Sequence, residues 1–94
     1  MKHHIIVKFS DAVTDKTALL GDIKALFAAA EPIPGVRGYQ FFPNCVARPN
    51  RYDLMIIVEL EPDALPNWDE SPLHKSWLSD FGDIVAQKAI FDCY

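Results

Sequence analysis

The sequence predicts a single α+β domain over residues 1–94, in which two helical segments interrupt four β-strands in the order β-α-β-β-α-β. Short runs rich in β-branched and aromatic residues at 3–10, 36–42, 52–60 and 85–94 are typical of strands. Apolar residues at spacings of three and four in 16–30 and in the second half of 62–81 indicate helices. A chain of 94 residues supports one hydrophobic core.

The first strand is HHIIVKFS at 3–10, and an amphipathic helix follows from Lys16 to Ala30. Thr14 or Asp15 can cap the start of this helix, because a short polar side chain there accepts a hydrogen bond from the first turn. Glu31-Pro32 ends it, since the residue before a proline is disfavoured in the helical region. Its apolar positions are Leu19, Leu20, Ile23, Leu26, Phe27 and Ala30.

The middle of the chain holds two strands separated by a loop. The second strand runs from Val36 to Phe42 and ends at Pro43-Asn44, and Cys45 to Arg51 reads as a solvated loop. YDLMIIVEL, at 52–60, is the clearest strand in the sequence.

The last third is a helical stretch over 62–81, broken by Pro66 and Pro72, followed by a fourth strand at 85–94. Ser71 can cap the helix that Pro72 begins. Its predicted apolar face consists of Leu73, Trp77, Leu78 and Phe81. This order of elements is the ferredoxin-like arrangement, with a four-stranded antiparallel sheet and the helices on one face.

The strands are apolar on both sides. Leu54 to Val58 are five consecutive apolar residues, whereas a sheet with one face in water alternates apolar and polar residues. Two helices can cover only one face, so the sequence predicts a homodimer in which the open sheet faces of two copies meet and form an α/β barrel.

Composition excludes several classes of function. Residues 62–94 hold six acidic and two basic side chains, and the net charge is −4, which disfavours nucleic acid as a partner. No run is long enough to cross a membrane and the first residues are too polar for a signal peptide, so we expect a cytoplasmic protein. Cys45 and Cys93 lack the spacing of a redox or zinc motif, and no cofactor motif is present.

Five segments, in order along nearly the whole chain, carry a family resemblance: KHHIIVKF, IPGV at 33–36, the apolar strand at 54–58, SPLH at 71–74 and the closing AIFDCY. Together they resemble the Dabb family of stress-responsive dimeric α/β barrels. The resemblance implies ferredoxin-like subunits that pair through their sheets. It also implies a pocket between helices and sheet, because some members are polyketide cyclases with histidines in such a pocket.

In those cyclases one histidine lies on the first strand and another ends an HPxH element, and these positions match His3 and His74. The sequence departs from the cyclases twice. Ser71 stands where the element has its first histidine, and Trp68 stands where the cyclases have a tyrosine, six residues before the second.

The candidate catalytic residues are therefore His74 and His3. An imidazole titrates near neutral pH and suits proton transfer. His74 can instead be a helix histidine bonded to a nearby backbone carbonyl. His3 shares a strand face with Ile5, Val7 and Phe9, and His4 lies on the opposite face.

Five aromatic residues are candidates to line a ligand pocket, although aromatic residues in so small a domain more often form its core: Trp68, Trp77, Phe27, Phe81 and Tyr39. Asp53 is expected to pair with Arg51 or Arg37. A divalent ion held by His3, His74 and Asp53 has no supporting spacing, so we predict no metal site.

The sequence thus predicts a dimer that binds a hydrophobic small molecule, with three alternatives for its role. The first is a cofactor-independent lyase or cyclase in which His74, assisted by His3, moves a proton on a hydrophobic carbonyl compound. The second is a non-catalytic, stress-responsive ligand-binding dimer. The third, which rests on fold analogy, is a cofactor-independent monooxygenase.

Overall fold

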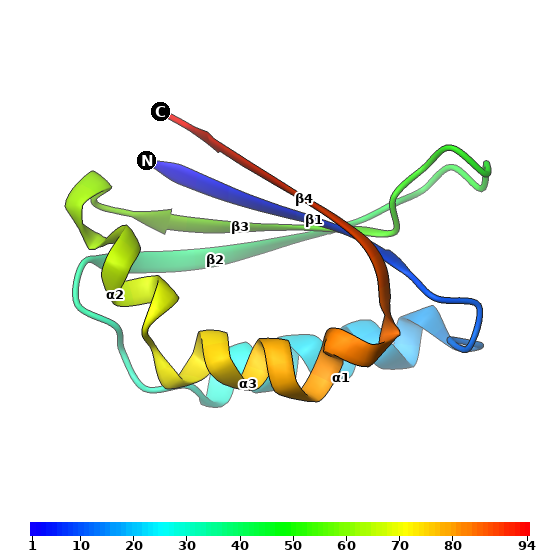
Figure 1. Ribbon diagram of the computed structural model, residues 1–94, viewed down its shortest axis with the longest axis horizontal. Helices are drawn as coiled ribbons and strands as arrows, with labels where there is room; N and C mark the ends of the chain where they lie inside the picture. Colours follow the sequence, from blue (N-terminus) through cyan, green and yellow to red (C-terminus); the bar gives the residue numbers. More distant parts are fainter.

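The computed structural model describes all residues, 1–94, and confirms the predicted order of elements. A four-stranded sheet lies above a layer of helices (Figure 1). The elements are β1 (Lys2–Phe9), α1 (Lys16–Ala29), β2 (Val36–Pro43), β3 (Leu54–Leu60), α2 (Leu65–Asp69), α3 (Pro72–Phe81) and β4 (Val85–Cys93), with short 3-10 helices η1 (Pro62–Ala64) and η2 (Gly82–Ile84). The predicted boundaries of the strands and of the first helix differ from these by one or two residues.

The strands are antiparallel in the order β2-β3-β1-β4, as the ferredoxin-like arrangement requires. The residues paired with His3 across the sheet matter for the site. His3 lies opposite Asp92 on β4 and opposite Val58 on β3, and Val58 lies opposite Tyr39 on β2. Directly paired residues point to the same face. Asp92, His3, Val58 and Tyr39 therefore form one row across the sheet, which we call the polar row.

The core fills the space between the sheet and α1 and α3. His3, Ile5, Val7 and Phe9 of β1 are all buried on this helix-facing side, as predicted. The prediction for Leu78 is wrong, because its side chain is 43% exposed. The buried residues of α3 are Leu73 and Trp77.

The helices do not cover the whole of their side of the sheet, which corrects the expectation that they would. Ile90 of β4 lies opposite the buried Ile5 and therefore points to the helix side, yet it is 50% exposed. In Figure 1 β4 runs along the edge of the sheet, above and apart from α3. This edge of the core is open to solvent.

The other side of the sheet has no helix over it. Apolar side chains of Ile6, Met55 and Phe91 lie there among the polar side chains of His4 and Gln40. This face is more mixed in character than the run of apolar residues in β3 predicts. Its largest exposed groups are Phe42 and Phe91, at 47% and 60%.

Local interactions explain where the helices begin. The carboxylate of Asp15 accepts a hydrogen bond from the Ala18 N–H, and Asp15 rather than Thr14 is the cap of α1. The Ser71 hydroxyl accepts from the His74 N–H and begins α3, as predicted. None of the helices is long and apolar enough to cross a lipid bilayer.

Asp53 does not pair with either predicted arginine. Its carboxylate accepts hydrogen bonds from the Phe9 N–H and from Lys16 Nζ, both at 2.8 Å, whereas Arg37 pairs with Glu61. The cause is tertiary, because α1 brings Lys16 to the start of β3.

Candidate functional site

The polar row is covered by one aromatic side chain from α2. The ring centroid of Trp68 lies 6.4 Å from that of His3, 6.2 Å from that of Tyr39 and 5.2 Å from that of His74. Trp68 thus neighbours both the strand histidine and the helix histidine and is itself fully buried. His3 and His74 therefore lie around the same indole.

His3 is held by a carboxylate that the sequence analysis did not identify. Its Nδ1 lies 2.5 Å from Oδ1 of Asp92, and its side chain is 8% exposed against 38% for Asp92. An ionised carboxylate only accepts hydrogen bonds, so the Nδ1–H of His3 donates to it. In the neutral imidazole Nε2 then carries the lone pair.

His74 is held in the same tautomer by a different partner. Its Nδ1 lies 2.9 Å from the backbone oxygen of Asp69, which can only accept, so Nδ1 carries the proton. This is the backbone hydrogen bond that the sequence analysis considered as the alternative to catalysis. In the neutral imidazole Nε2 then carries the lone pair, and such a nitrogen can act as a base. The structural bond and a chemical role are therefore compatible.

The indole N–H of Trp68 has no hydrogen-bond partner although it is buried, and it is the one buried side-chain polar atom in this condition. Buried donors in native proteins are nearly always paired, because an unpaired one costs about 1–3 kcal/mol. The site therefore contains one donor available to an acceptor atom that enters it.

Tyr39, at the far end of the polar row, adds a second polar group. Burial raises the pKa of its phenol above the ordinary 10.0, so the hydroxyl stays protonated at neutral pH. A phenol is thus present in the site, although position 68 lacks the tyrosine of the cyclases.

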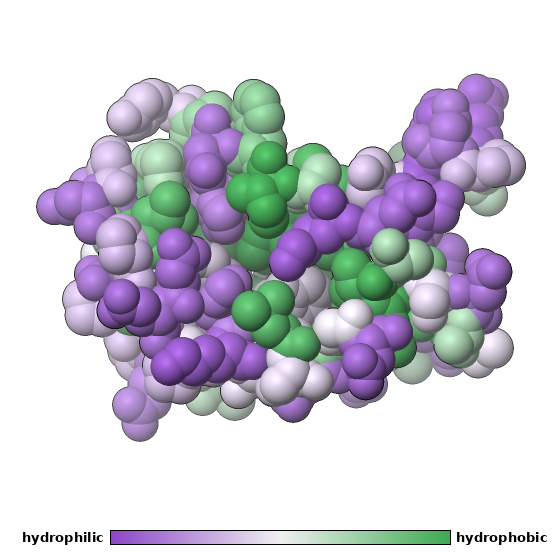
Figure 2. Space-filling view, in the orientation of Figure 1, coloured by the Kyte–Doolittle hydropathy of each residue, from purple (hydrophilic) through white to green (hydrophobic).

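The edge of the sheet at β4 is open to solvent beside the histidine site. The half-exposed Ile90 precedes Asp92 by two residues on the same strand face. Hydrophobic surface gathers in the middle of this face, over β4 and α3 (Figure 2). A cavity of about 280 Å³ lies between α3 and the start of β4, and its lining includes Trp77, Leu78 and Lys88. It lies toward the Phe9 end of β1, and neither histidine lines it.

The predicted pocket-lining aromatics form one cluster. Phe27 packs edge-on against Tyr39 at 5.1 Å and lies 6.1 Å from Trp68, and Trp77 lies 5.6 Å from Phe81. Phe27, Trp68 and Trp77 are buried, whereas Tyr39 and Phe81 are half-buried. Of the five, only Trp77 borders the α3–β4 cavity, and the other four lie outside its lining.

Asp53 lies at the opposite end of β1 from His3, beside Phe9, and so does not join the two histidines. No group of three or more His, Cys, Asp or Glu side chains is arranged to hold a metal ion. Both cysteines are free thiols, with Cys45 exposed and Cys93 half-buried.

Asp92 is the site residue that sequence reasoning missed. The available signal was that the first and last strands are neighbours in a ferredoxin-like sheet. The register that places Asp92 opposite His3 depends on tertiary pairing, and no local pattern specifies it.

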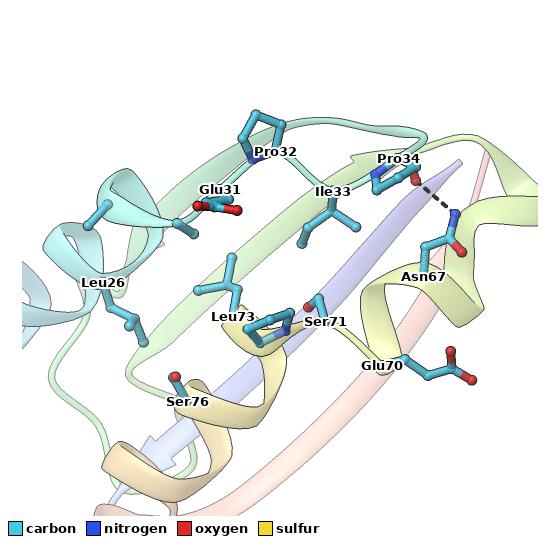
Figure 3. A pocket seen from close by; sticks show the side chains of 13 residues that line it. Leu26, Glu31, Pro32, Ile33, Pro34, Asn67, Glu70, Ser71, Leu73 and Ser76 are labelled. Carbon is cyan, nitrogen blue, oxygen red and sulfur yellow. Dashed lines mark hydrogen bonds between the residues drawn. The ribbon is translucent and has the colours of Figure 1, made fainter.

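A second, larger groove lies between the end of α1, residues 30–34 and the α2–α3 junction (Figure 3). Its volume is about 480 Å³, and Ser71, Pro72 and Leu73 of the SPLH segment line it. His74, the last residue of that segment, is not part of its lining. Helix α3 therefore separates the groove from the histidine site.

Comparisons with solved structures agree with this architecture. A dimeric ferredoxin-like protein of unknown function from Thermobifida fusca superposes with a TM-score of 0.76 at 20% identity, over 96% of this chain and 85% of that one. A Dabb family protein from Mesorhizobium loti gives 0.74 at 16% identity, over 99% and 93%. A hydroxynitrile lyase from Passiflora edulis gives 0.71 at 11% identity, over 96% and 87%.

Neither a family model nor a curated protein matches the sequence. The ferredoxin-like fold is therefore confirmed, and the resemblance to the Dabb family is supported at the level of the fold. At such identities the likeness establishes the fold alone.

Proposed function

We propose that this protein is a homodimer that binds a hydrophobic carbonyl compound at the open edge of β4, beside Ile90 and Asp92, and acts on it as a cofactor-independent lyase or cyclase. The observation that carries the proposal is the His3–Asp92 pair at 2.5 Å, in which the imidazole is buried and the carboxylate partly exposed, with Trp68 next to both His3 and His74. Two imidazoles with their Nδ1 protons engaged offer two Nε2 atoms for proton transfer.

The dimer in this proposal forms through the helix-free face of the sheet. Phe42 and Phe91 are the largest exposed apolar groups there. Burial of apolar surface yields about 25 cal/mol per Å² before the cost of association. The dimeric neighbours of this fold support such an assembly.

The chemistry follows from the tautomers. The Nε2 of His74 removes a proton from the substrate, and the imidazolium so formed returns that proton to the leaving atom, while His3 assists. The indole N–H of Trp68, which lacks a partner, suits the carbonyl oxygen as its donor. A ligand reaches this donor when the indole moves aside.

The test uses benzaldehyde cyanohydrin, a probe prompted by the lyase among the structural neighbours. The base takes the hydroxyl proton, the O–H electron pair forms the C=O bond, the C–CN bond breaks, and cyanide leaves and takes a proton to give HCN. Benzaldehyde formation is followed by absorbance. We expect His74→Ala to lower kcat/KM at least about 100-fold, as is typical for loss of a general base.

His4→Ala is the matched control, because His4 lies on the opposite face of β1. The far-ultraviolet circular dichroism of each variant checks that it folds. Equal turnover by the wild type and by the His3→Ala/His74→Ala double variant contradicts the proposal.

A non-catalytic ligand-binding dimer is the second candidate, and one observation favours it. Trp68 is fully buried next to both histidines, and the Nδ1 of His74 is already bonded within the helix layer. This alternative predicts that benzaldehyde binds equally well to the wild type and to His74→Ala, and that neither protein turns over the cyanohydrin.

A further inference from the structure

The groove of Figure 3 is a site apart from the histidines, and its walls are apolar. Its apolar lining includes Leu26 and Ala29 from the last turn of α1, Ile33 from the following loop and Leu73 from α3, together with three prolines: Pro32, Pro34 and Pro72 (Figure 3). A volume of about 480 Å³ is within the usual range for small-molecule sites. The residues that line this groove take no part in the proposed proton transfer.

The charge around this groove has one sign. Glu31 and Glu70 are the only charged residues in its lining, and no lysine, arginine or histidine is among them. In Figure 3 Glu31 projects from the loop over the groove, and Glu70 stands at the opposite rim with its carboxylate directed outward. Neither carboxylate takes part in a salt bridge; the three ion pairs of the chain are His3–Asp92, Lys16–Asp53 and Arg37–Glu61.

Two other polar side chains of the groove, those of Asn67 and Ser71, are already hydrogen-bonded. Asn67 donates its side-chain N–H to the Pro34 oxygen at 2.9 Å (Figure 3). The Ser71 hydroxyl donates to the Trp68 oxygen and accepts from the His74 N–H. The C-terminal end of α1 and the N-terminal end of α3 meet here, and their partial charges are opposite and offset each other.

The groove therefore offers an apolar surface with two unpaired carboxylates at its edge. Such a surface is complementary to a molecule with an apolar body and a positive head, because a charge beside an apolar wall is less screened than one in bulk water. We infer that this groove binds a small amphiphilic amine, with its hydrocarbon part between α1 and α3 and its ammonium group at Glu31, while Glu70 on the opposite rim adds to the negative charge around it.

The test compares three probes that share an eight-carbon chain: octylammonium, octanol and octanoate, each below its critical micelle concentration. Binding is followed by two-dimensional ¹H–¹⁵N NMR of the full chain, which locates each probe. We expect the amides of Ala29, Ile33 and Leu73 to shift with octylammonium, more weakly with octanol, and not with octanoate.

The double variant Glu31→Gln/Glu70→Gln removes both charges and keeps the shape of the side chains. It should bind octylammonium roughly 3- to 10-fold more weakly, as expected for two exposed charges, and should bind octanol as before. Asp22→Asn/Asp83→Asn is the matched control, because it changes the net charge equally at exposed sites outside the groove.

Three results overturn the inference. These are that octanoate binds as tightly as octylammonium, that the glutamate variant binds octylammonium as the control does, or that none of the probes shifts the groove amides. A loss of cyanohydrin turnover in His74→Ala bears only on the proposed function, because His74 is not part of this groove.

Discussion

Replacement of Gly35 by alanine should be the most damaging small change in this chain. Gly35 has a φ of +82°, which disfavours every residue with a Cβ. A Cβ built there comes closer to the Ala64 Cβ than the 3.0 Å that real Cβ atoms essentially never breach. The Gly35 oxygen also accepts a hydrogen bond from the Glu61 N–H at 2.9 Å, so this contact fixes η1 and, after it, the helix that carries Trp68.

The expected cost has two parts. The left-handed conformation costs about 1–2 kcal/mol for an alanine. Overpacking against the buried Ala64 costs about 1–3 kcal/mol, because the neighbour is a Cβ fixed to the backbone and cannot rotate away. The free energy of unfolding should therefore fall by about 2–5 kcal/mol, which lowers Tm by roughly 10 °C or more.

Urea unfolding followed by circular dichroism measures the effect. Gly21→Ala is the matched control, because Gly21 lies inside α1 with nothing within 4 Å of a Cβ, and it should stabilise the chain by up to about 1 kcal/mol. Ala64→Gly in the Gly35→Ala background should recover the overpacking part alone. A Gly35→Ala chain within 0.5 kcal/mol (about the error of such data) of the wild type refutes the reasoning.

Three further predictions concern Asp53, Asp92 and Phe91. Burial alone would raise the pKa of Asp53, but the bonds it accepts and the charge of Lys16 outweigh burial and hold that pKa below 3.8. Asp53→Ala should cost about 1–3 kcal/mol at pH 7, and only the wild type should lose this contribution as pH falls below 3.8, which acid unfolding of both chains checks. Asp92→Ala should leave the imidazole of His3 as a mixture of its two neutral tautomers, which long-range ¹H–¹⁵N NMR detects. A neutral His3 with its proton on Nε2 in the wild type contradicts the assignment. Phe91→Glu should convert a dimer into a monomer in light scattering at micromolar concentration, whereas Tyr94→Glu, beyond the end of β4, should not.

The two candidate histidines could be found from the sequence, but their surroundings could not. The alternation of β1 placed His3 on the helix-facing side, and Ser71-Pro72 marked the start of the helix that carries His74. These are local patterns of strand and helix, so one sequence is enough to read them. The unpaired indole N–H of Trp68 has no such pattern, because it results from everything that packs around the ring.

The two positions that depart from the cyclase pattern also show which features the sequence reveals and which depend on tertiary structure. A serine at position 71 looked like the loss of a catalytic histidine, and the structure gives its hydroxyl a defined role as cap of α3 and donor to the Trp68 oxygen. Position 68 lacks the phenol of the cyclases, but Tyr39 of β2 supplies a phenol in the same row as His3. The sequence separates these two positions by 29 residues, and only the sheet brings them together.

The order of elements and the Ser71 cap of α3 followed from the sequence alone, because they depend on residues within a few positions of one another. Tertiary structure decided which carboxylate meets which cation or imidazole, so Lys16 rather than an arginine holds Asp53, and Asp92 holds His3. It also decided that the helices leave β4 uncovered, since the placement of α3 over the sheet depends on the fit of the whole core. Both the exposed edge of β4 at Ile90 and the acidic groove lined by α1 and α3 are consequences of that placement.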